Sequence, residues 1–70
     1  MYKIKDLQLD QYFADGNTFA NKKEACEQLI SYHSQDTDIS QEQELLDAGK
    51  VDECWDLLAE YEWKLEEVKL

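Results

Sequence analysis

The chain has 70 residues with 17 acidic and seven basic side chains, so its formal net charge is −10 at pH 7. Most of this charge is local, since residues 36–70 hold twelve Asp or Glu against three Lys, whereas residues 1–35 hold five against four. The length allows one small domain, residues 1–70, with a thin core. The lack of Arg and of a lysine cluster argues against direct nucleic-acid binding, because phosphates require clustered cations.

The sequence indicates neither a membrane segment nor export. Its apolar runs are at most three residues long, far too short for a transmembrane helix. The N-terminus lacks the basic region and apolar run of a secretory signal. Cys26 and Cys54 show no C-x-x-C spacing. We therefore expect two reduced core thiols in a cytoplasmic protein; for a secreted chain, a disulfide is the alternative.

Both ends of the chain alternate as half-buried strands do. Over residues 1–7, Tyr2 and Ile4 point to one side and Lys3 and Lys5 to the other. Residues 61–68 alternate in the same way: Tyr61, Glu62, Trp63, Lys64, Leu65, Glu66. We predict that the two strands pair, so that the two lysines face Glu62 and Glu66. The alternative is that residues 61–68 continue the preceding helix.

Residues 8–20 leave two interpretations open. Asp15-Gly16 is a turn signal, flanked by the aromatic residues Tyr12, Phe13 and Phe19. The segment is either a small hairpin or an irregular loop that packs its aromatic rings on the core.

The middle of the chain is helical in pattern. Asn21 and Glu24 form a capping box that opens a helix over residues 22–34. Ser40 and Gln43 form a second box, opening a short helix that ends at Gly49, a residue suited to a left-handed helix end. A third helix follows, from Val51 to residue 60.

These elements predict an α+β domain, in which a small antiparallel sheet of two or three strands packs against about three helices. The apolar positions of each element define the expected core: Tyr2, Ile4, Phe19, Ala25, Leu29, Ile30, Leu45, Leu46, Val51, Trp55, Leu58, Trp63 and Leu65.

One stretch has the oxygen spacing of an EF-hand calcium loop: Asp36, Asp38, Ser40, Glu42, Glu44 and Asp47. The pattern fails where the geometry is strictest, because Gln41 stands where a glycine is needed and Asp47 is shorter than the usual bidentate Glu. A helix cap explains the same residues. We therefore predict no metal site here.

Other catalytic and metal patterns are weak. His33 is the single imidazole, and with Cys26 and Cys54 it lacks the ligand spacing of a zinc site. A Cys54–His33 nucleophile pair would require a depressed thiol pKa, which the negative second half of the chain opposes. There is no phosphate-binding glycine loop. We predict a non-enzymatic protein without cofactor, metal or catalytic residues.

The surplus of acidic residues favours a protein partner with a basic surface. Asp52, Asp56 and Glu60 recur every four residues and form one ridge along the third helix, which we call the acidic ridge. With its neighbours it makes up the acidic face, the candidate interaction site: Asp47, Asp52, Glu53, Asp56, Glu60 and Glu62. The alternatives are a DNA mimic that inhibits a nucleic-acid-binding protein, then an enzyme of unknown type, and a charged face that serves solubility alone.

Two resemblances accompany these patterns. The stretch from Leu45 to Leu58, LLDAGKVDECWDLL, resembles the helix-turn-helix of tetratricopeptide and pentatricopeptide repeats, but it occurs once, so it implies only a helical hairpin. The stretch from Phe19 to Ser34, FANKKEACEQLISYHS, with the later Leu45-Leu46 and Trp63, resembles small acidic proteins of Gram-positive bacteria and their phages. That resemblance implies an accessory phage or prophage product and no particular site residues.

Overall fold

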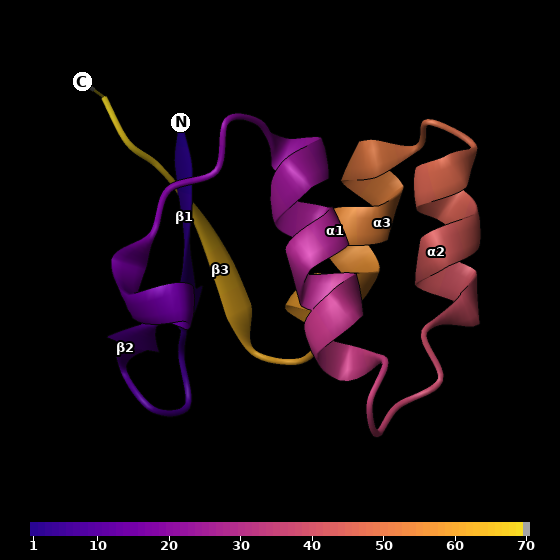
Figure 1. The fold of residues 1–70 in the computed structure, drawn as a ribbon, viewed down its shortest axis with the longest axis horizontal. Coiled ribbons are helices and arrows are strands. Elements are labelled where there is room, and N and C mark those ends of the chain that lie inside the picture. Colours follow the sequence, from indigo (N-terminus) through magenta and orange to yellow (C-terminus); the bar gives the residue numbers. More distant parts are fainter. Residues whose placement is uncertain (70) are drawn as a thin grey trace.

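The first and last strands of the chain pair with each other. The computed structural model describes residues 1–69 and contains strands β1 (Tyr2–Asp6), β2 (Gln11–Tyr12) and β3 (Trp63–Glu67). Strand β1 lies between the other two and is antiparallel to both (Figure 1). The predicted α+β class is therefore confirmed, and residues 63–67 are a strand and not a helical extension.

The register between β1 and β3 places the apolar residues on one face. Ile4 lies opposite Leu65, and Lys3 lies opposite Glu66, as predicted. The prediction for Lys5 is wrong, because Lys5 lies opposite Lys64 and makes an ion pair with Asp10 at 3.1 Å. Glu62 is in the turn before β3, with a φ of +68°, so it does not take part in the strand alternation.

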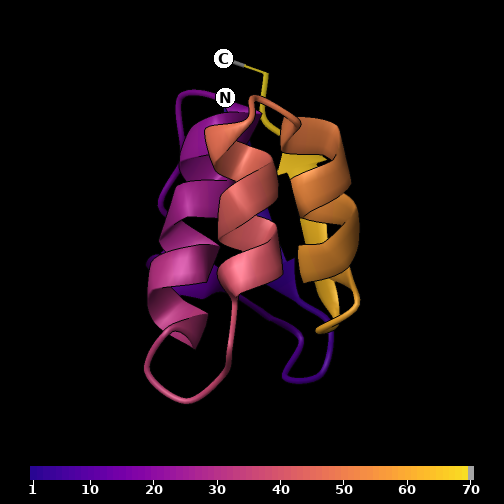
Figure 2. The ribbon, with the colours of Figure 1, turned by 90° about the vertical axis from the view of Figure 1, so that its right-hand side faces the viewer.

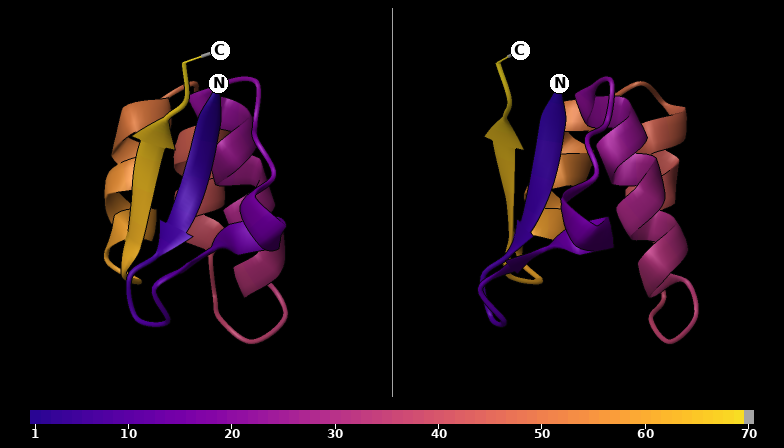
Figure 3. Two further views of the ribbon diagram at one scale, coloured as in Figure 1. Left: turned by 90° about the vertical axis from the view of Figure 1, so that its left-hand side faces the viewer. Right: turned by 60° about the vertical axis from the view of Figure 1, so that its left-hand side comes forward.

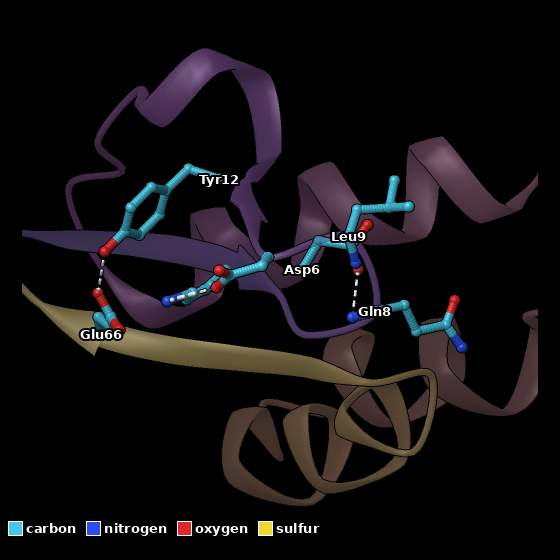
Figure 4. A network of polar contacts seen from close by, with 7 residues as sticks. Asp6, Gln8, Leu9, Tyr12 and Glu66 are labelled. Atoms are coloured by element: carbon cyan, nitrogen blue, oxygen red, sulfur yellow. Dashed lines mark hydrogen bonds and ion pairs between the residues drawn. The ribbon is translucent and has the colours of Figure 1, made fainter.

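Residues 8–20 do not form a hairpin around Asp15-Gly16; instead β2 pairs with β1 across a turn at residues 7–10. One side-chain oxygen of Asp6 accepts hydrogen bonds from the backbone N–H groups of Gln8 and Leu9, at 2.9 and 3.2 Å (Figure 4). This Asx-type turn leads β1 into β2. Asp15-Gly16 instead lies in the short 3₁₀ turn Phe13–Gly16, where both residues have a positive φ.

The helices cover only one face of the sheet (Figure 3). The Tyr12 ring lies on the other face, beside Lys3 and Lys5. The hydroxyl of Tyr12 donates a 2.7 Å hydrogen bond to Glu66 of β3 (Figure 4). The ammonium groups of Lys3 and Lys5 lie 5.2 and 5.8 Å from the centre of its ring. Tyr12 thus links all three strands across the open face of the sheet.

The helices are α1 (Lys22–His33), α2 (Ser40–Asp47) and α3 (Val51–Ala59). Asn21 caps α1 as predicted, since its side chain accepts from the Glu24 N–H at 2.8 Å. The prediction that Ser40 caps α2 is wrong: the carboxylate of Asp38 accepts from both the N–H and the hydroxyl of Ser40. Gly49, with a φ of +78°, lies between α2 and α3 as expected.

The elements form three layers. Helices α1 and α3 lie on the sheet, whereas α2 contacts α1 and α3 and none of the strands. Figure 1 shows α2 as the layer farthest from the sheet, and Figure 2 shows it in front of the seam between the other two helices. None of the helices within residues 1–69 is long and apolar enough to span a bilayer.

Most of the predicted core is buried, including both tryptophans, which are each 8% exposed. Tyr2, Leu45, Val51 and Leu65 are only half-buried. The two predicted core thiols are fully buried as well: Cys26 on α1 and Cys54 on α3, both free.

The two thiols are adjacent and poorly ionisable. Burial, the neighbouring Cys54 and a hydrogen bond to it raise the pKa of Cys26 to about 12. Burial and the charge of Glu42 also raise the pKa of Cys54. The helices α1 and α3 therefore meet through a pair of neutral thiols that behave as small apolar groups.

A cluster of aromatic side chains and His33 covers one end of the sheet. The indole N–H of Trp63 donates a 2.9 Å hydrogen bond to Nε2 of His33, at the end of α1. His33 stacks on Tyr61 with 4.5 Å between ring centres, and Phe13 meets Trp63 edge-on at 5.6 Å. This cluster joins α1, the 3₁₀ turn and β3.

Alkaline pH will weaken the fold through Cys26. In the unfolded chain this thiol ionises near its ordinary pKa of 9, whereas in the folded chain it keeps its proton until about pH 12. Between these values the unfolded state binds fewer protons, so the free energy of unfolding falls as the pH rises.

The measurement is urea unfolding, followed by tryptophan fluorescence under reducing conditions, at several pH values in this window. Cys26→Ala serves as the control, because groups that do not contact Cys26 titrate equally in both chains. The stability advantage of the wild type over C26A should shrink with rising pH; a constant difference would contradict the assignment.

The bond between Trp63 and His33 should be worth a measurable part of the stability. His33→Phe keeps a ring against Tyr61 but leaves the half-buried indole N–H without its acceptor, at a cost of about 1–3 kcal/mol. A double-mutant cycle with Trp63→Phe, measured by chemical denaturation, isolates the bond. H33F should cost less in the W63F background, and an equal cost in both backgrounds would refute the role of the bond.

Candidate functional site

All six residues of the acidic face are exposed, and all but Glu62 lie on α2 or α3 or at the end of α3. Asp52 and Asp56 belong to α3, and Glu60 is the helical residue that caps its end. Because four residues advance a helix by about 6 Å, the three carboxylates follow one another along one side of α3. The structure therefore retains the acidic ridge. The remaining members lie around its two ends: Asp47, Glu53 and Glu62.

Two members of the acidic face already have partners. Asp52 accepts a 2.7 Å ion-paired hydrogen bond from Lys22 of α1. Asp47 accepts a hydrogen bond from the Gln43 amide, one turn back along α2. The side chains of the other four make no hydrogen bond or ion pair within residues 1–69: Glu53, Asp56, Glu60 and Glu62.

Local helix physics explains some of these positions but not all. Asp52 and Glu53 lie in the first turn of α3, where the helix dipole favours negative charge. Glu60 lies at the opposite end, where the dipole disfavours it. The end of the ridge at Glu60 is therefore the part of the acidic face that has no evident structural purpose.

Sequence reasoning missed a seventh carboxylate, Glu42, which points inward from α2. It is only 6% exposed and is the one buried charged residue in the described chain. Its carboxylate makes no hydrogen bond or ion pair within residues 1–69. The sequence did carry a signal: Ile39, Glu42 and Leu46 are spaced three and four residues apart, so Glu42 occupies the apolar stripe of α2.

Glu42 borders a hollow of about 290 Å³ between the start of α2 and the end of α3. Figure 2 shows these two helix ends side by side at the same end of the molecule. Asp38 lies before α2, and Glu60 closes the acidic ridge on the other side. The walls are completed by two apolar or aromatic side chains and two small polar ones: Leu57, Tyr61, Ser40 and Gln41.

Asp38 is held firmly beside this hollow. Its Oδ1 accepts the Ser40 N–H at 3.0 Å and also the Ser40 hydroxyl. These bonds lower the pKa of Asp38, which stays ionised at neutral pH. The hollow therefore combines a fixed carboxylate from the loop, a buried one from α2 and an exposed one from the end of α3.

The calcium-like spacing is dispersed by the fold. Asp36 and Asp38 lie in a loop, whereas residues 40–47 form α2 and so point in different directions around a helix. Within residues 1–69, no three side chains of the His, Cys, Asp or Glu types come close enough to hold a metal ion.

The residues considered for nucleophilic chemistry are engaged elsewhere. Nε2 of His33 accepts the Trp63 indole bond at one end of the sheet. Cys54 is fully buried beside Cys26, and its raised pKa is the opposite of what a nucleophilic thiol requires.

Comparison with known proteins adds no family to this geometry. Neither a protein-family model, nor a curated protein, nor a solved structure matches the chain.

Proposed function

We propose that this protein is a small non-enzymatic interaction module that binds the basic surface of a protein partner through its acidic face. The single observation that carries the proposal is the set of four exposed carboxylates without an internal cation: Glu53, Asp56, Glu60 and Glu62. Placing unpaired like charges together on a chain of net charge −10 costs stability through self-repulsion. A basic partner relieves that cost, and the negative potential of the acidic face steers the partner towards it.

The shape of the molecule is consistent with a binding role. Five of the six residues of the acidic face lie on α2 or α3 or at the end of α3, so a partner can reach these carboxylates without disturbing the strands. The resemblance to small acidic phage proteins is our reason for proposing an accessory role in a phage or prophage.

A second function, a DNA mimic that occupies a nucleic-acid-binding cleft, is favoured by one observation. The three carboxylates of the acidic ridge follow a single helix at regular intervals, as phosphates follow a strand. Its partner would also be basic, so the two functions differ in what competes for the partner.

The test compares two triple variants with the same net charge. Neutralising Glu53→Gln, Asp56→Asn and Glu62→Gln removes three charges from the acidic face. Neutralising Asp15→Asn, Glu27→Gln and Glu67→Gln removes three exposed charges elsewhere, so both chains carry −10 + 3 = −7. Each immobilised protein is used to capture partners from the lysate of a Gram-positive bacterium, with elution by rising salt.

We expect the wild type and the Asp15/Glu27/Glu67 variant to retain the same partner, which elutes as salt screens the charges. The acidic-face variant should lose it. Equal retention by both variants would contradict the proposal. Displacement of the captured protein by duplex DNA would favour the DNA mimic.

A further inference from the structure

We propose that the hollow beside Glu42 receives an arginine side chain of the partner protein. This inference rests on the proposed function, since the same basic partner would supply the arginine. It adds a defined point of contact to an acidic face that is otherwise flat and exposed. The proposal depends on the burial of Glu42, the placement of the surrounding carboxylates and the shape of the hollow.

Glu42 is placed where a free protein gains nothing from it. It occupies the apolar stripe of α2, between Ile39 and Leu46, and is 6% exposed without a hydrogen-bonding or ionic partner within residues 1–69. Its carboxylate oxygens still reach water, because no side-chain oxygen within residues 1–69 is both fully buried and without a hydrogen-bond partner. A cation entering the hollow would replace that water and give the Glu42 carboxylate an ionic partner.

The neighbouring groups suit a cation on a long side chain. Asp38 is fixed by its two bonds from Ser40, and Glu60 at the end of the acidic ridge is exposed and unpaired. Leu57 and Tyr61 provide an apolar wall for methylene groups. At about 290 Å³ the hollow is at the lower limit of the range for drug-sized ligands, which suits a single side chain.

A guanidinium fits these walls better than a metal ion or an ammonium group. No three potential ligands within residues 1–69 come close enough to share one ion. A guanidinium is planar and carries five N–H donors, so it can reach carboxylates that a single ion or a point-like ammonium cannot bridge. The ring of Tyr61, which lines the hollow and is 39% exposed, offers a surface on which it can stack.

The test uses a defined probe, the peptide acetyl-Gly-Arg-Gly-amide, titrated into the ¹⁵N-labelled full chain and followed by NMR. Matched peptides replace the arginine by lysine, or by citrulline, which has the same shape without the charge. The protein variants are Glu42→Gln and, as the control, Glu44→Gln, which removes an exposed carboxylate from the same helix.

We expect amide shifts at residues 38–42 and 57–61, with affinity for the arginine peptide about ten-fold weaker in E42Q, because a charged hydrogen-bonded contact is lost. E44Q should bind within about two-fold of the wild type, since its charge lies outside the hollow. The lysine peptide should bind more weakly, and the citrulline peptide should not bind. E42Q removes a buried charge with little change of shape, so its thermal midpoint should not fall below that of the wild type.

Equal affinity of E42Q and E44Q for the arginine peptide would overturn the proposal, as would binding of the citrulline peptide or shifts confined to residues 52–56. If calcium chloride alone shifts the Glu42 amide signal, and E42Q abolishes that shift, the hollow binds a metal ion and not an arginine side chain. The Glu53/Asp56/Glu62 variant reports separately on the acidic face. If it loses its partner while the peptide fails to bind, the hollow is refuted and the proposed function stands.

Discussion

The antiparallel pairing of β1 with β3 is the interaction on which the rest of the molecule depends. Five backbone pairs hold residues 2–6 against residues 63–67, and all three helices lie in the chain between them. The pairing extends at both ends, through a bond from the Leu7 N–H to Glu62 and another from the Val68 N–H to Met1. Phe19 adds to it by exchanging two backbone bonds with Tyr2. Without this pairing, Ile4 and Trp63 would not form the wall on which α1 and α3 pack.

How far the sequence predicts this fold depends on how local each signal is. The Asn21 cap and the spacing of Ala25, Leu29 and Ile30 are set within one helix, so α1 is predicted with nearly correct ends. The strands are recognisable because alternation is also local. The register of the strands cannot be recognised from the sequence, because it depends on the backbone conformation of Glu62. This residue has a positive φ and lies outside the strand, and no neighbouring residue requires that conformation. The hairpin turn was misplaced for a similar reason, since the Asp6 side chain determines it and Asp15-Gly16 does not.

In the candidate site, too, local patterns predict some features and miss others. Exposure of the acidic ridge follows from helical periodicity, so Asp52, Asp56 and Glu60 were predictable from the sequence, whereas Glu62 lies in a turn that was not predicted. Glu42 is not predicted to be buried, because a glutamate in the first turn of a short helix is usually a capping or surface residue. Its burial follows only from the position of α2 over the seam between α1 and α3. Residues that break the local pattern of an element are often found at functional sites, where stability is sacrificed to binding. Glu42 is the clearest such residue among those described.

The position of β3 also bears on how the protein is made. A ribosome synthesises the chain from its N-terminus at about 5–20 residues per second, so α1, α2 and α3 are made before the strand that completes the sheet. Until residue 67 has emerged, β1 has no partner along most of its length, and the apolar faces of α1 and α3 have no complete wall to pack against. Closing so long a segment is slow compared with helix formation. A nascent chain that still lacks β3 therefore has an incomplete core, and the repulsion among its many carboxylates keeps separate chains apart during that time.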